Sequence, residues 1–104
     1  MEIFYNKLVR DKIPEMIESN GEKPNFRILD SDEYKQCLAQ KLDEEVREYH
    51  IDQNPEELAD ILEVVFALGE TLGISKEGLL EQYENKHKAR GGFRNRIFLI
   101  SKEG

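Results

Sequence analysis

The sequence predicts a mainly α-helical protein, and three observations lead to this fold class. Over most of the chain, apolar residues recur every three or four positions, which is the period of a helix that buries one face. Capping residues, prolines and glycines mark the ends of these stretches. Only two short segments have the alternating pattern of strands. We therefore expect a bundle of about four helices, which could include a small two-stranded ribbon.

Each expected helix begins at residues suited to that position. Pro14 falls in the first turn of the first helix, where its missing N–H does no harm. Asp30 offers a capping side chain to the second helix. Asn54 and Pro55 suit the N-cap and first position of the third helix, and Ser75 caps the fourth. The expected spans are about residues 11–19, 32–50, 55–72 and 75–90.

The remaining ordered segments are expected to be extended. Residues 25–29 follow a proline and partly alternate, and residues 93–100 are also strand-like. The two could pair as a ribbon. Two strands alone are marginally stable, so this ribbon would have to pack on helices.

Composition narrows the function classes. A chain of 104 residues is expected to form one domain, residues 1–104. The formal net charge of −7 argues against nucleic acid as the main partner, because duplex binding needs basic surface. The single cysteine, Cys37, allows no intrachain disulfide. No apolar stretch approaches the ~20 residues of a membrane span and no signal peptide is evident, so we expect a cytoplasmic protein without membrane contact.

Acidic residues interrupt the apolar faces of the second and third expected helices. Glu45 points in the same direction as Leu42, inside the apolar stripe, and Glu48 lies at its edge. Glu57 and Asp60 share a face in the next helix. Buried carboxylates without a partner are costly, and a hard divalent cation between them removes that cost. The pattern therefore predicts a metal site. The alternative is that these are ordinary acidic positions on solvated helices.

These acids also carry a family resemblance. The order E-E-x-x-E (Glu44, Glu45, Glu48) followed by E-x-x-D (Glu57, Asp60) resembles the signature of the all-α nucleoside triphosphate pyrophosphohydrolases. This superfamily includes the MazG-like proteins and phosphoribosyl-ATP pyrophosphohydrolase. The resemblance implies a helical bundle that binds Mg²⁺, with Mn²⁺ as a substitute, and hydrolyses a nucleotide to a monophosphate and pyrophosphate.

The resemblance covers most of the chain. The opening YNKLVRDKIPEMIE and the closing KHKARGGFRNRIFL are similar to segments of a small MazG-like branch. One feature departs from MazG itself: only eight residues separate Glu48 from Glu57, fewer than is usual between the two motifs. Any substrate preference of MazG that depends on the loop between these helices is therefore not expected for this chain.

The resemblance implies roles for the individual acids. Glu45, Glu48, Glu57 and Asp60 would hold one or more Mg²⁺ ions, directly or through water. The catalytic set would be Glu44, Glu45 and Glu48, of which Glu44 either coordinates metal or orients the attacking water. The metal would bind the triphosphate and lower the pKa of that water.

Two groups of cations could bind the phosphates. Lys86 and Arg90 continue the apolar face of the fourth helix, which could bring them towards the acids. Favourable charge at a helix C-terminus explains them equally well. The resemblance of the KLVRDK segment adds Lys7, Arg10 and Lys12, whose alternative is a solvated helix start.

The third expected helix also predicts self-association. It is apolar on nearly every side, and so small a domain has too few helices to cover it. We expect the side with Leu62 and Phe66 to meet a second copy, in a homodimer or a dimer of dimers. The rival function is a non-catalytic, dimeric helical module that binds a nucleotide or a protein. Within the enzyme class, a phosphoribosyl-ATP pyrophosphohydrolase is the alternative.

Overall fold

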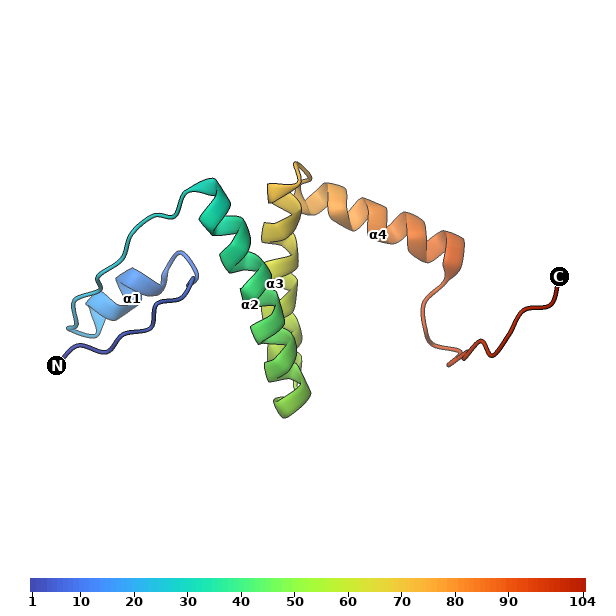
Figure 1. The fold of residues 1–104 in the computed structure, drawn as a ribbon, viewed down its shortest axis with the longest axis horizontal. Helices are drawn as coiled ribbons and strands as arrows, with labels where there is room; N and C mark the ends of the chain where they lie inside the picture. Colours follow the sequence, from blue (N-terminus) through green and yellow to red (C-terminus); the bar gives the residue numbers. More distant parts are fainter.

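The computed structural model describes all residues from 1 to 104 and contains four α-helices and no β-strand. In chain order they are α1 (Ile13–Ser19), α2 (Ser31–Asp52), α3 (Pro55–Thr71) and α4 (Lys76–Arg90). Figure 1 shows α2 and α3 side by side in the middle of the molecule, with α1 on one side and α4 on the other. The mainly helical fold class and the number of helices are confirmed.

The starts of the three longer helices are fixed by side-chain caps. The Asp30 carboxylate accepts a hydrogen bond from the backbone N–H three residues on, at 2.9 Å. The Asn54 and Ser75 side chains accept equivalent bonds at 3.0 and 3.1 Å. Each bond satisfies a donor that the first turn of a helix leaves free. The capping residues proposed from the sequence are therefore confirmed.

A tight turn makes α2 and α3 an antiparallel hairpin. Gln53 adopts a left-handed conformation (φ 47°), and its N–H donates to the carbonyl oxygen of Tyr49 at 2.8 Å. Pro55 then begins α3 at once. Leu38 and Val64, the two most buried apolar residues, come from these two helices. The two helices thus pack against each other well beyond the turn, since Leu38 lies in the N-terminal half of α2 and Val64 in the C-terminal half of α3.

The junction between α3 and α4 depends on a glycine. Gly69 is buried, and a Cβ atom at this position would lie 3.2 Å from Ile74 Cγ2 and 3.4 Å from Leu79 Cδ2. The missing side chain therefore lets the turn and the start of α4 approach α3 closely. Beyond this contact α4 diverges from the hairpin, as Figure 1 shows.

The two-stranded ribbon was predicted wrongly. Residues 25–29 and 93–100 contain no strand. The first segment leads into α2 and the second follows α4, which points away from the hairpin, so they end on opposite sides of the molecule (Figure 1). A strand needs a partner for its backbone groups. Alternation in the sequence does not supply that partner.

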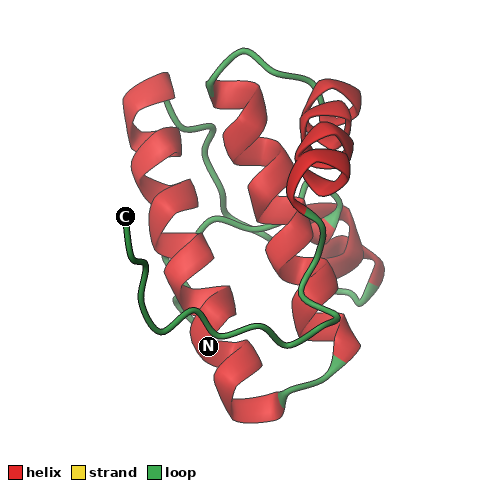
Figure 2. Ribbon diagram, turned by 90° about the vertical axis from the view of Figure 1, so that its right-hand side faces the viewer, coloured by secondary structure: helices red, strands yellow, loops and turns green.

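The chain is open rather than closely packed. Its principal extents are 65 × 32 × 22 Å, and Figure 2, which views the molecule along its longest axis, shows helices and loops without any strand. Only 4 of its 104 residues are buried, and the accessible surface is 9791 Å². No helix has the length and apolar character needed to cross a membrane.

Candidate metal centre

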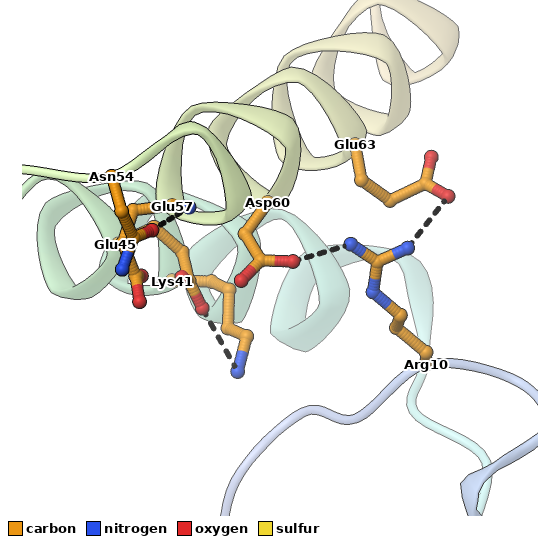
Figure 3. Close-up of polar contacts among 7 residues, drawn as sticks. All are labelled: Arg10, Lys41, Glu45, Asn54, Glu57, Asp60 and Glu63. Carbon is orange, nitrogen blue, oxygen red and sulfur yellow. Dashed lines mark hydrogen bonds and ion pairs between the residues drawn. The ribbon is translucent and has the colours of Figure 1, made fainter. Parts of the chain in front are cut away.

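Three carboxylates from the two helices of the hairpin converge, and together they form what we call the acidic cluster: Glu45 of α2 with Glu57 and Asp60 of α3. One oxygen from each lies within 4.8 Å of the others. The antiparallel hairpin explains this meeting, because residues shortly before the turn face residues shortly after it. Figure 3 shows the three side chains pointing into the same region. This group could hold a metal ion.

Glu45 is the most enclosed member of the acidic cluster. The residue is 7% exposed, which confirms that it lies on the inward face of its helix. Its Oε1 atom lies 3.7 Å from Lys41 Nζ, whereas its Oε2 atom is buried without a hydrogen-bond partner. Burial raises the pKa of Glu45 and the charge of Glu48 raises it further, while Lys41 acts in the opposite direction. The ionised form is therefore disfavoured in the absence of a cation.

Glu57, like Glu45, has a buried carboxylate oxygen that lacks a hydrogen-bond partner. It lies in the first turn of α3, where its backbone N–H donates to the Asn54 side chain. Its Oε2 atom is buried and has no hydrogen-bond partner. Burial raises its pKa, and the charges of Glu48, Asp52 and Asp60 add to the effect. Two members of the cluster thus hold an unsatisfied buried oxygen, which is unusual in a folded protein.

Asp60 differs because it has a strong partner. Arg10 Nη2 donates to Asp60 Oδ1 at 2.7 Å, and Arg10 Nη1 donates to Glu63 Oε1 at 3.3 Å. In Figure 3 the guanidinium group reaches α3 from the segment before α1. The Asp60 side chain is 41% exposed, so it is far more accessible than that of Glu45.

The donor set fits a hard divalent ion. All three groups are carboxylates, the ligands that Mg²⁺ and Mn²⁺ prefer, and no sulfur or imidazole is among them. Two cluster oxygens have no protein partner that a metal would need to displace. The partial exposure of Asp60 leaves this edge of the cluster accessible to water, which could complete an octahedron around an ion.

The other acids of the motif lie around this cluster. Glu48 is half-buried on α2, and its charge raises the pKa of both Glu45 and Glu57, so it is close enough to join through water. Glu44 lies further from the cluster, with its Oε2 atom 4.0 Å from Lys41 Nζ. The three-carboxylate group therefore contains Glu45, Glu57 and Asp60 but neither Glu44 nor Glu48.

The candidate phosphate-binding cations are not gathered at the cluster within one chain. Lys86 and Arg90 are exposed near the far end of α4, which diverges from the hairpin (Figure 1). Lys7 and Lys12 are also exposed, and Lys7 Nζ lies 6.0 Å from the centre of the Tyr5 ring. Of the five proposed cations, Arg10 alone forms an ion pair with a member of the cluster.

Two charged partners of the site were missed from the sequence. Lys41 pairs with Glu44 and Glu45, and Glu63 shares Arg10 with Asp60. Their spacing could have revealed them, because Lys41 precedes the two glutamates by three and four positions and Glu63 follows Asp60 by three.

Comparison with known proteins leaves the family open. No family model matches the chain, and no solved structure matches it. A 42-residue stretch is 55% identical to part of an uncharacterized protein of Mycolicibacterium smegmatis. The match covers 40% of this chain and 43% of that protein. The chain is thus similar to less than half the length of this relative.

Proposed function

We propose that the protein is a Mg²⁺-dependent nucleoside triphosphate pyrophosphohydrolase that releases a nucleoside monophosphate and pyrophosphate. The observation that carries this proposal is the pair of buried, unpartnered oxygens of Glu45 and Glu57 beside Asp60. Buried polar atoms in folded proteins nearly always have a hydrogen-bond partner, because an unpaired one destabilises the fold. Two such atoms side by side are therefore expected where a ligand binds and supplies the missing partner. The motif order E-E-x-x-E and E-x-x-D, which resembles that of the all-α pyrophosphohydrolases, supports the same reaction class.

Each residue has a defined part in the proposed reaction. Glu45, Glu57 and Asp60 hold the ion, and Glu48 joins them directly or through water. When bound, the ion supplies charge for the triphosphate oxygens and lowers the pKa of a water molecule. Glu44 orients the attacking water or serves as a further ligand. The water adds to phosphorus as the bond to the leaving pyrophosphate breaks.

The same proposal includes a second copy of the chain. A compact monomer of 12.2 kDa exposes about 6,000 Å², whereas this chain exposes 9791 Å². The excess, about 3,700 Å², exceeds the surface that each chain contributes to a large obligate dimer, about 2,500 Å². Leu62 of α3 is 52% exposed and Leu72, the C-cap residue that follows α3, is 84% exposed, so apolar surface is available for the contact. A homodimer that pairs again into a dimer of dimers would bury this area.

One observation favours the rival function, a non-catalytic helical module. Lys86 and Arg90 do not approach the acidic cluster in one chain, so the predicted set of phosphate-binding cations is incomplete there. A module that binds a metal or nucleotide without cleaving it does not need that set. A cytoplasmic location belongs to either proposal, since the single cysteine forms no intrachain disulfide.

Incubation with Mg²⁺ and a panel of canonical and modified nucleoside triphosphates tests the proposed function. We expect pyrophosphate and a monophosphate from at least one substrate, and loss of both products in Glu57→Gln. Glu81→Gln provides a matched control, because this acid is exposed on α4. Release of orthophosphate would indicate a different phosphatase chemistry. Absence of any product, with metal still bound, would favour the non-catalytic module.

A further inference from the structure

We propose that Arg10 and a divalent ion compete for Asp60, so that metal binding releases the Arg10 guanidinium to bind the phosphates of the substrate. Arg10 donates to Asp60 at 2.7 Å and to Glu63 at 3.3 Å. Its segment precedes α1, and α1 packs against no other helix of the chain. The arginine is therefore a tether between the N-terminal segment and α3.

The charges around the cluster explain why an arginine is found there. Glu45 is more than nine-tenths buried with one unpartnered oxygen, so the cluster needs more positive charge than Lys41 provides. Arg10 supplies one further charge, but only at the exposed edge. Its side chain is 53% exposed, and ion pairs of that kind contribute little free energy. The contact is therefore easily exchanged for a stronger one.

The geometry makes metal binding compete with the ion pair between Arg10 and Asp60. Mg²⁺ takes oxygens at 2.0–2.1 Å, which places neighbouring ligands about 3 Å apart. The cluster atoms lie within 4.8 Å of one another, so the carboxylates close further around an ion. Asp60 is partly exposed, and Arg10 holds its Oδ1 atom on the side away from Glu45 and Glu57, so closure of Asp60 around an ion would pull against this ion pair. A divalent ion also repels the nearby guanidinium group.

Release leaves Arg10 suited to bind substrate. A guanidinium group offers a planar fork of donors that matches phosphate oxygens bidentately. Arg10 lies at the open side of the cluster, where a metal-bound polyphosphate would extend. Metal loading and phosphate binding would thus be coupled through one side chain, which Glu63 helps to hold in the metal-free state.

Calorimetric titration with Mn²⁺ tests the competition. We expect Arg10→Met to bind Mn²⁺ roughly threefold to tenfold more tightly than the wild type, because a competing and repelling cation is gone. Arg27→Met is the matched control, since it also breaks an exposed arginine–glutamate pair, at 2.8 Å from Glu33 and outside the cluster. That variant should bind Mn²⁺ as the wild type does. Circular dichroism checks that both variants retain their helices.

A second titration tests the transfer to phosphate. With Mn²⁺ at saturation, inorganic tripolyphosphate should bind Arg10→Met severalfold more weakly than the wild type. Opposite changes for metal and polyphosphate would not arise from a purely structural role. Unchanged or weaker Mn²⁺ binding in Arg10→Met would overturn the competition, and equal or absent tripolyphosphate binding in the wild type and the variant would overturn the transfer. The inference about Arg10 rests on the proposed function, so wild-type protein that binds no Mn²⁺ would refute the inference and the proposed function together. If the wild type binds Mn²⁺ and Arg10→Met does not behave as expected, only the inference about Arg10 is refuted.

Discussion

Replacement of Glu45 by glutamine should stabilise the metal-free protein and remove its response to Mg²⁺. The residue is 7% exposed, its Oε2 atom has no hydrogen-bond partner, and burial followed by the charge of Glu48 raises its pKa. All three observations mean that the ionised side chain is unfavourable in the fold without a cation. Glutamine keeps the shape of the side chain and removes the charge.

The size of the effect follows from two opposing contributions. A buried polar group without a partner costs about 1–3 kcal/mol, and more when it is charged, so the neutral amide of glutamine, which also lacks a partner, removes only the part of this cost that comes from the charge. Against this, glutamine loses the attraction of Lys41 at 3.7 Å, which contributes up to about 1 kcal/mol. We expect a net stabilisation of about 1 kcal/mol, which corresponds to a rise in melting temperature of about 4–8 °C for a domain of this size. The wild type should instead gain about 2.7 kcal/mol from Mg²⁺ at a hundred times the dissociation constant.

Thermal unfolding followed by circular dichroism, with and without Mg²⁺, measures both effects. The protein concentration must be fixed, because the melting temperature of an oligomer depends on it. The control variant Glu81→Gln should change stability by less than about 0.5 kcal/mol and keep the response to Mg²⁺. A Glu45→Gln protein that is less stable than the wild type without metal, or that Mg²⁺ stabilises as strongly, would refute the reasoning.

Four further variants and one pH series extend these expectations. The stability advantage of Glu45→Gln over the wild type should shrink as the pH falls towards 4.5, the ordinary pKa of a glutamate. The pKa of Glu45 is raised in the folded protein, so the wild-type side chain becomes protonated, and no longer unfavourable, over this range. Urea unfolding of both proteins at several pH values measures the difference, and a difference that stays constant would contradict the prediction. Asn54→Ala should lower the free energy of unfolding by about 1 kcal/mol and also weaken Mn²⁺ binding, because this cap holds the first turn of α3. The control Ser75→Ala should lower the free energy of unfolding by the same amount, about 1 kcal/mol, and leave Mn²⁺ binding, measured by calorimetry, unchanged. Gly69→Ala should destabilise the protein by about 1–3 kcal/mol in urea, because its Cβ would lie 3.2 Å from Ile74 Cγ2; an unchanged midpoint would show that the junction adapts. Leu62→Glu should lower the mass measured by light scattering while the helical signal persists, and an unchanged mass would place the self-contact elsewhere.

The sequence was most informative where a local rule decides the outcome. The caps at Asp30, Asn54 and Ser75 depend only on residues within one turn, and all three form the expected bonds. The inward position of Glu45 follows from the helical period of its apolar neighbours, and the residue is indeed buried. The convergence of Glu57 and Asp60 on it required one further fact, the short antiparallel turn, which Asn54 and Pro55 also indicate.

The sequence was least informative about relations between distant segments. The alternation in residues 25–29 and 93–100 suggested a pair of strands, but the direction of α4 separates them. The start of α4 packs closely on α3 at Gly69, a contact that no periodicity reveals. Lys86 and Arg90 continue the apolar face of their helix, and both are exposed near the end of α4 that diverges from the hairpin. The pairing of Arg10 with Asp60 was likewise unpredictable, because fifty positions separate the two residues.

Two features of this chain lack a partner, the acidic cluster and the exposed apolar surface, and they need partners of different kinds. The acidic cluster lacks positive charge, whereas exposed apolar side chains lie on all four helices and on the segments before α1, before α2 and after α4. A metal ion cannot cover apolar surface, and an apolar contact cannot neutralise Glu45. If the cluster is complete within one hairpin, a Leu62→Glu protein that has lost its second copy should still bind Mn²⁺ with wild-type affinity. If Mn²⁺ binding and mass fall together, the second copy must supply part of the metal site, and exposed cations or acids of α4 would be the first candidates to replace.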